Sequence, residues 1–77
     1  MSLNLYIIKV FFTLNKSSEV KLEVFNSLGQ SVKSISKEKL STGKNEITFS
    51  TSDFSEGIYH LRFSVEGSVV TKKLVKM

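Results

Sequence analysis

Short runs of alternating apolar and polar residues, separated by turn-forming residues, constrain this chain more than any other feature. In the clearest run, Val20, Leu22 and Val24 alternate with charged neighbours. Because successive side chains of a strand point to opposite faces, this period predicts a half-buried strand with its charges in water. Similar runs predict further strands at residues 5–14, 30–39, 46–49, 58–65 and 68–76. No segment shows a convincing helical period, so we predict an all-β sandwich or small barrel without a helix.

The same alternation predicts which side chains form the core. We expect the buried set to be Val20, Leu22, Val24, Ile47, Phe49, Tyr59, Leu61, Phe63 and Val65. Phe54 is the lone large apolar residue of its loop and should plug one end of this core. Val32 and Ile35 are three positions apart and cannot share a face of a regular strand, so we expect a β-bulge near residues 33–34.

Turn signals separate the predicted strands. They lie at residues 15–18, 26–29, 40–45 and 66–67, and a longer loop covers residues 51–57. Gly29 and Gly57 each end a connection at the entry to a strand. We therefore expect both to have a positive φ or a close backbone neighbour.

The length and composition permit one small domain and few kinds of site. A chain of 77 residues is too short for two cores at ~150 residues per domain. It contains no cysteine and a single histidine, His60, which excludes disulfides, thiolate sites and clustered imidazole ligands for a metal. We expect no cofactor.

The sequence also argues against catalysis. Asp53 and His60 could be combined with a serine, but no Gly-x-Ser-x-Gly elbow positions one, and His60 falls on the outer face of its predicted strand. Glutamates are numerous enough to offer pairs, yet so small a domain has no cleft to raise the pKa of one of them. We therefore predict that the protein is not an enzyme.

The net charge of +4 raises the question of nucleic-acid binding. Ten of the eleven basic residues are lysines, and Arg62 is the only side chain capable of a bidentate grip. Phe25 falls on the charged face of its strand, where it could stack on a sugar or a base. Lysines without arginine partners or an aromatic-studded sheet face are a poor footprint for nucleic acid, so we do not predict this function.

The start of the chain is apolar but fits neither a membrane span nor a secretory leader. Residues 5–14 are too short to cross a bilayer, which needs ~20 residues, and Lys9 lies among them. No basic region precedes them and no small-x-small cleavage site follows. Met1-Ser2-Leu3 has the form of a start added to a fragment, so we expect a piece of a longer protein.

Four local patterns occur in a characteristic order and spacing. They are the hairpin at 20–32, VKLEVFNSLGQSV; the turn at 40–45, LSTGKN; the strand entry at 54–59, FSEGIY; and the basic end at 72–76, KKLVK. Together they resemble the type A C-terminal sorting domain of the type IX secretion system of Bacteroidetes, over about residues 10–77.

The resemblance implies an immunoglobulin-like antiparallel sandwich of six or seven strands. It implies that residues 1–77 are one sorting domain at the end of a larger protein that is secreted or carried to the cell surface. The partners implied are the outer-membrane export machinery, the upstream passenger and a sortase-like protease that commonly removes the domain. The alternative is an immunoglobulin-like accessory module for adhesion or polysaccharide binding.

In one respect the chain departs from the family pattern. The family usually carries a Pro-Asn-Pro-like motif before its first strand, and this sequence contains no proline. Either the fragment begins after that motif, so that a short N-terminal strand is missing and a sheet edge is open, or residues 1–9 diverge from the family pattern. Residues 5–14 are strongly β-prone and guarded only by Lys9, so we expect self-association through them. Their inward face is ambiguous, since Ile7 and Phe11 are as apolar as the alternate set.

Recognition by the machinery would need exposed features on a stable fold. The candidate recognition residues are Asn26, Gly29, Gln30, Gly43, Gly57, Tyr59, Lys72, Lys73 and Lys76. The last three form the one concentration of charge, which would attract an acidic receptor surface. Removing residues 72–77 should then leave the passenger folded but trapped in the cell envelope.

Overall fold

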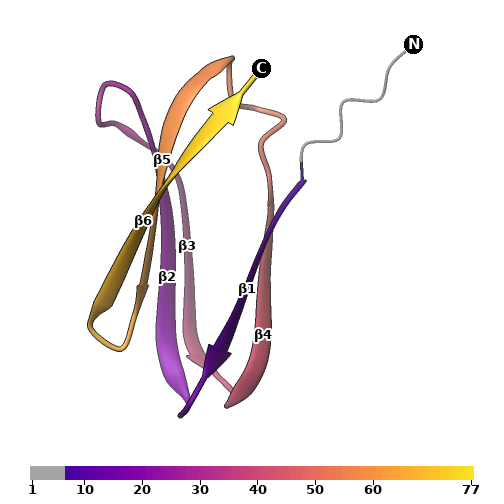
Figure 1. Ribbon diagram of the computed structural model, residues 1–77, viewed down its shortest axis with the longest axis vertical. Helices are drawn as coiled ribbons and strands as arrows, with labels where there is room; N and C mark the ends of the chain where they lie inside the picture. Colours follow the sequence, from indigo (N-terminus) through magenta and orange to yellow (C-terminus); the bar gives the residue numbers. More distant parts are fainter. Residues whose placement is uncertain (1–6) are drawn as a thin grey trace.

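The computed structural model describes residues 7–77, which form six antiparallel strands and, within that range, no helix (Figure 1). The strands are β1 (Ile7–Leu14), β2 (Ser18–Asn26), β3 (Ser31–Leu40), β4 (Gly43–Ser50), β5 (Gly57–Val65) and β6 (Ser68–Lys76). The predicted first strand began at residue 5. Residues 1–6, with the suspected added start, lie outside the described residues.

The strands form two sheets, which confirms the predicted all-β sandwich. β3, β2, β5 and β6 make a four-stranded sheet in that order, and β1 pairs with β4 in a two-stranded sheet. The two sheets lie side by side in Figure 1, with β1 and β6 on the side nearer the viewer. Every pairing is antiparallel; tight turns join β2 to β3 and β5 to β6, whereas β1–β4 and β2–β5 pair strands that are distant in the sequence.

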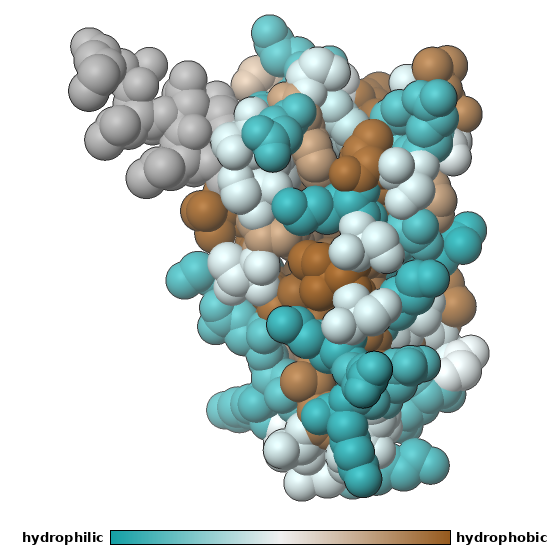
Figure 2. Space-filling model, turned by 180° about the vertical axis from the view of Figure 1, so that it is seen from behind, coloured by the Kyte–Doolittle hydropathy of each residue, from teal (hydrophilic) through white to brown (hydrophobic). Residues whose placement is uncertain are grey.

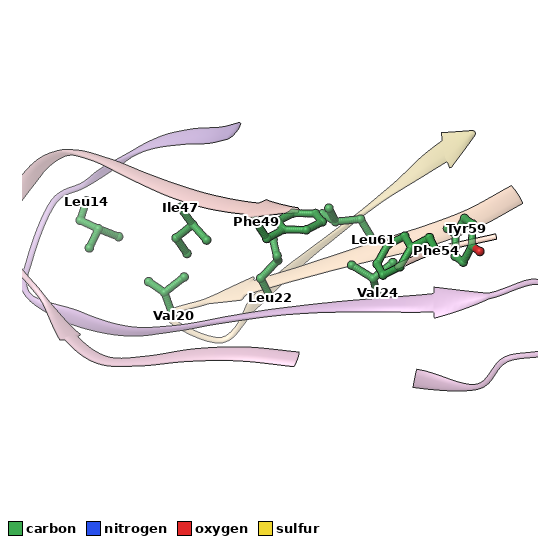
Figure 3. Packing of buried hydrophobic residues seen from close by; sticks show 9 residues of the cluster. All are labelled: Leu14, Val20, Leu22, Val24, Ile47, Phe49, Phe54, Tyr59 and Leu61. Carbon is green, nitrogen blue, oxygen red and sulfur yellow. The ribbon is translucent and has the colours of Figure 1, made fainter. Parts of the chain in front are cut away.

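The core is centred on β2, because this strand lies inside its sheet and beneath the two-stranded sheet. Val20, Leu22 and Val24 have no exposed surface. Ile47 and Phe49 of β4 lie on the opposite wall of the core (Figure 3). Each fully buried aliphatic side chain contributes about 1.5–3 kcal/mol, so this strip dominates the stability of so small a domain.

Seven of the nine predicted core residues are buried, and the prediction for Phe63 and Val65 is wrong. These two are only half-buried and pack against the rim of the core. The two-stranded sheet is too narrow to cover the whole four-stranded sheet. Side chains of the wider sheet that lie near β6 are therefore packed against fewer atoms of the opposite sheet. The Phe63 ring also lies against the Phe12 ring of β1, at a centroid distance of 4.9 Å.

Two further residues complete the core. Phe54 is buried, which confirms its predicted role as a plug. Leu14 is buried at the end of β1, while Phe11 remains 71% exposed. The inward face of β1 is therefore the even-numbered one, and the ambiguity in the sequence is resolved.

The predicted irregularity in β3 is present but lies earlier than expected. Val24 pairs with Lys33 and Phe25 with Ser31, so Val32 is the extra residue of a bulge. This shift sets Ile35 opposite Leu22 on the inner face. A second irregularity lies nearer the end of β3, where Val20 pairs with Lys37 and Ser18 with Leu40.

The turns agree with the sequence in kind, with two corrections of length. Gly29 and Gly57 have φ values of 83° and 152°, as predicted. Glu66 and Gly67, at 51° and 79°, form the predicted two-residue hairpin turn. The turn expected at 40–45 is shorter, since only residues 41–42 separate β3 from β4, and β2 already begins at Ser18.

Truncating the centre of the core should nearly unfold the domain. Leu22→Ala is expected to lower the free energy of unfolding by about 2–5 kcal/mol, because it removes a fully buried side chain and leaves a cavity. Val69→Ala, at a position 58% exposed, is the control and should change it by less than about 0.5 kcal/mol. Urea titration followed by circular dichroism measures both, and equal effects would contradict the assigned core.

The two predicted glycine positions should respond differently to asparagine. A Cβ at Gly29 or Gly57 would meet no atom within 4 Å, so alanine costs only backbone strain, about 1 kcal/mol. Gly29→Asn should be milder than Gly29→Ala, because asparagine tolerates the left-handed region. Gly57 lies far outside that region, so asparagine should not be milder there. Thermal melts of the four variants test this, and unchanged melting temperatures would refute the turn geometry.

Candidate recognition surface

Asn26 organises the turn between β2 and β3. Its Oδ1 accepts hydrogen bonds from the backbone N–H groups of Leu28 and Gln30, at 3.0 and 2.9 Å. Its Nδ2 donates to Gln30 Oε1 at 2.9 Å, and its carbonyl accepts from the N–H of Gly29 at 3.0 Å. Asparagine is favoured at such a position because its side chain can satisfy the turn's own backbone donors. The hairpin is thereby held in one shape, with Leu28 at its tip.

Tyr59 ties the loop between β4 and β5 to the start of β5. Its hydroxyl donates to the carbonyl of Ser55 at 2.6 Å, and its ring stacks on Phe54 with centroids 4.9 Å apart. The N–H of Phe54 donates to the carbonyl of Thr51 at 3.0 Å. The loop is therefore anchored by a buried aromatic pair and closed by its own hydrogen bond.

Lys76 fixes the same loop from the last strand. Its Nζ donates to the carbonyls of Thr51 and Phe54, at 2.5 and 2.6 Å. Position 76 pairs with Gly57 and lies on the inner face of β6, together with Leu74. Because the ammonium group of Lys76 donates to two backbone carbonyls, it holds the loop in place. It is therefore not an exposed charge that could attract a receptor.

These contacts shape one end of the sandwich, which we call the hairpin pole and define as the 26–30 turn, the 51–56 loop and the start of β5. It contains a concavity of about 400 Å³. Three exposed apolar side chains border it: Leu28, Val32 and Ile58, with exposed fractions of 82%, 40% and 44%. The other lining side chains are charged, polar or aromatic, and include Lys33, Asp53, Glu56, Phe54 and Tyr59.

Six of the nine candidate residues belong to the hairpin pole or support it. They are Asn26, Gly29, Gln30, Gly57, Tyr59 and Lys76. Gly43 lies at the opposite end of the sandwich, where it pairs with Leu14 (Figure 1). Lys72 and Lys73 lie along β6, away from the pole.

The three basic residues near the C-terminus do not form one patch. Lys72 pairs with Leu61 and lies on the inner face of β6, whereas Lys73 pairs with His60 and lies on the outer face. Lys76 is engaged with the 51–56 loop. Period two along a strand separates neighbouring charges in this way, which a count along the sequence overlooks.

The apolar rim of the pole was missed in the sequence. Leu28 gave a usable signal, since a leucine at a hairpin tip has no core to enter. Ile58 gave a partial signal, because it falls on the outer face of its predicted strand, and Val32 gave none. Neither residue indicated a place near Leu28, because the bulge of β3 and the pairing of β5 decide it. In the sequence, Asp53 and the glutamates, Glu56 among them, are weighed only for catalysis, and Lys33 is one of the dispersed lysines.

Other surfaces offer less. The Arg62 guanidinium lies 5.1 Å from the centre of the Phe25 ring, so an intramolecular partner occupies the aromatic face considered for stacking. His60 lies between Phe25 and Lys73 on the outer face. Within residues 7–77 there is no cluster of three potential metal ligands among His, Asp and Glu. In the same range no helix is long and apolar enough to cross a membrane.

Comparison with known families identifies the chain. The family model described as the secretion system C-terminal sorting domain matches residues 7–77. The protein belongs to this family. No curated protein and no solved structure gave a significant match.

The family defines the function in outline. The domain is a C-terminal sorting signal of type IX secretion, and it marks proteins for the cell surface or for release. Such a domain works with the type IX machinery and with an upstream passenger. Domains of this family are in general non-catalytic. The match favours the sorting interpretation, and nothing supports the accessory module considered from the sequence.

The contacts of Lys76 predict that the three lysines differ in their effect on stability. Lys76→Gln should lower the free energy of unfolding by about 1–3 kcal/mol, because two loop carbonyls lose a charged donor. The double variant Lys72→Gln with Lys73→Gln should change it by less than about 0.5 kcal/mol, since both residues are exposed. Denaturant unfolding distinguishes the two, and an equal loss in both variants would contradict the assigned contacts.

Proposed function

We propose that the hairpin pole is the part of this sorting domain that the export machinery reads. The observation that carries the proposal is the convergence of Leu28, Val32 and Ile58 around one concavity. Partly exposed apolar side chains around a hollow, with charges among them, are the usual composition of a protein-binding site. Residues 1–77 would thus act as one folded address at the end of a longer exported protein.

In this proposal most of the sequence-predicted residues act indirectly. Asn26, Gly29 and Gln30 fix the hairpin that presents Leu28, while Tyr59 and Lys76 fix the loop that carries Asp53 and Glu56. Gly57 allows the chain to enter β5 with a φ that other residues rarely adopt. The receptor would contact the rim that these residues hold in place, rather than the residues themselves.

Charge has a smaller part in the proposal. Lys33 lines the pole together with Asp53 and Glu56, so the concavity presents both signs of charge. Lys72 and Lys73 would add long-range attraction, which raises encounter rates more than affinity. Removal of residues 72–77 would abolish export chiefly because it deletes half of β6 and Lys76.

The proposal includes the finer assignments of partner and chemistry. A sortase-like protease would separate the domain from its passenger after export, and the domain would contribute no catalytic group. Its role would be to remain folded and to present the pole.

Export of a reporter fused upstream of the domain tests the proposal. The double variant Leu28→Ser with Ile58→Thr removes apolar rim area and leaves the turn hydrogen bonds intact. We expect export to fall by about tenfold or more, the usual scale for losing a hot spot. The melting temperature should stay within a few degrees of the original, because neither side chain belongs to the core.

Two matched controls accompany this variant. Val69→Thr removes an equally apolar side chain that is 58% exposed and lies at the other end of β6, and it should leave export unchanged. Lys72→Gln with Lys73→Gln removes charge without removing the Lys76 contacts, and it should reduce export only slightly. Normal export of the rim variant, or an equal loss in the Val69 control, would refute the proposal.

A further inference from the structure

The sandwich is open on the side where β1 and β6 lie. Because β1 pairs only with β4 and β6 only with β5, each has a free edge there. A groove of about 440 Å³ runs between these strands. Its apolar lining comes from Ile8, Val10, Phe11 and Phe12 of β1, Leu61 and Phe63 of β5, and Val70 and Leu74 of β6.

The groove exists because the two sheets differ in width. β1 lies over β5, as the Phe12–Phe63 contact shows, and no described strand covers β6. Val70 is consequently 48% exposed although it points to the inner face, opposite Phe63. One more strand beside β1 would cover it.

Of the four edge strands, β1 is the least protected against pairing. Inward-pointing lysines guard β3 and β6, at Lys33 and Lys37 and at Lys72 and Lys76. β4 carries two charges on its outer face, whereas β1 carries only Lys9. Figure 2 shows the opposite side of the molecule, where hydrophilic side chains border and partly cover the apolar surface.

A lone extended segment fits this edge better than a second copy of the domain. On this side β6 extends beyond β1. The four-stranded sheet of a second copy, paired through its own β1, would therefore meet β6 of the first copy. A single strand has no second sheet and meets no such obstacle. It would add to the β1–β4 sheet by main-chain hydrogen bonds, with alternate side chains directed onto Val70 and Leu74.

The charges around the groove indicate the chemistry of that segment. Lys9, Lys72 and Lys73 line it, and no acidic residue does. We propose that the free edge of β1 and the β1–β6 groove accept one extended peptide segment of a partner protein, with apolar residues on one face and acidic residues on the other. This surface is separate from the hairpin pole, so the proposal does not depend on the function proposed above.

Binding of short synthetic peptides to the whole chain tests the proposal. The probe is a fluorescein-labelled eight-residue peptide that alternates valine and glutamate, matched in length to β1. A peptide of the same composition with its backbone N-methylated at alternate positions controls for main-chain pairing. A valine–lysine peptide controls for charge. Fluorescence anisotropy gives the affinities, and sedimentation of the protein alone gives its oligomeric state.

Protein variants locate the binding. Lys9→Glu should weaken binding of the valine–glutamate peptide by about tenfold or more, because Lys9 lies on the outer face of β1, on the same side as the peptide's glutamates, and attraction becomes repulsion. Lys44→Glu makes the same change on the other strand of the two-stranded sheet and should have little effect, because Lys44 does not line the groove.

The expected result is binding of the acidic peptide alone, lost on N-methylation and weakened by Lys9→Glu. Equal binding of the N-methylated or lysine peptide, equal sensitivity to Lys44→Glu, or no binding at millimolar concentration would overturn the proposal. A dimer that Lys9→Glu dissolves would also overturn it, since the occupant would then be a second copy, as the self-association predicted from the sequence requires.

Discussion

The structure depends on one mismatch, in which a two-stranded sheet covers a four-stranded sheet. The two-stranded sheet can fully cover only the central part of the wider sheet. Val20, Leu22 and Val24 of β2 lie in this covered part and are completely buried. These side chains meet Ile47 and Phe49 from the opposite sheet. A domain of this size buries only about two-thirds or less of the surface its unfolded chain exposes, so this covered part supplies most of the cohesive energy.

The same mismatch explains where the domain has surface to offer. Beyond the covered part, the ends and open sides of the sandwich must be closed by loops or left apolar. At the hairpin pole a loop closes the core with Phe54, and Tyr59 and Lys76 anchor that loop. At the β1–β6 side nothing in the described chain closes it, and a groove remains. The hairpin pole and the β1–β6 groove therefore have the same origin, because the smaller sheet leaves part of the larger sheet uncovered. A loop covers that part at the pole, and no described segment covers it at the groove.

The sequence correctly predicted features that depend on residues close together in the chain. It failed to predict features that depend on contacts between distant segments. Alternation around Leu22 is local, so it predicted the strand and its buried face. The burial of Phe63 depends on how many strands lie above it, which no local period records. The position of the bulge at Val32 depends on the pairing partner in β2.

The candidate site shows the same division. Asn26 and Gly29 were identified because turn chemistry is local, but their effect is to shape the hairpin. The interpretation of Lys76 as part of a charge cluster missed its contacts, since two backbone carbonyls of a distant loop have no sequence signature. The rim of Leu28, Val32 and Ile58 could not be predicted, because only the folded sheet brings these residues together.

The central claim is that the secretion machinery contacts the hairpin pole. Site-specific photo-crosslinking during export tests it most directly, with benzoylphenylalanine replacing Leu28 in one fusion protein and Val69 in another. Both positions are exposed, at 82% and 58%, and they lie at opposite ends of the sandwich. The account predicts an adduct with a component of the export machinery from position 28 and none from position 69. Adducts from position 69 alone, or equally from both positions, would contradict it.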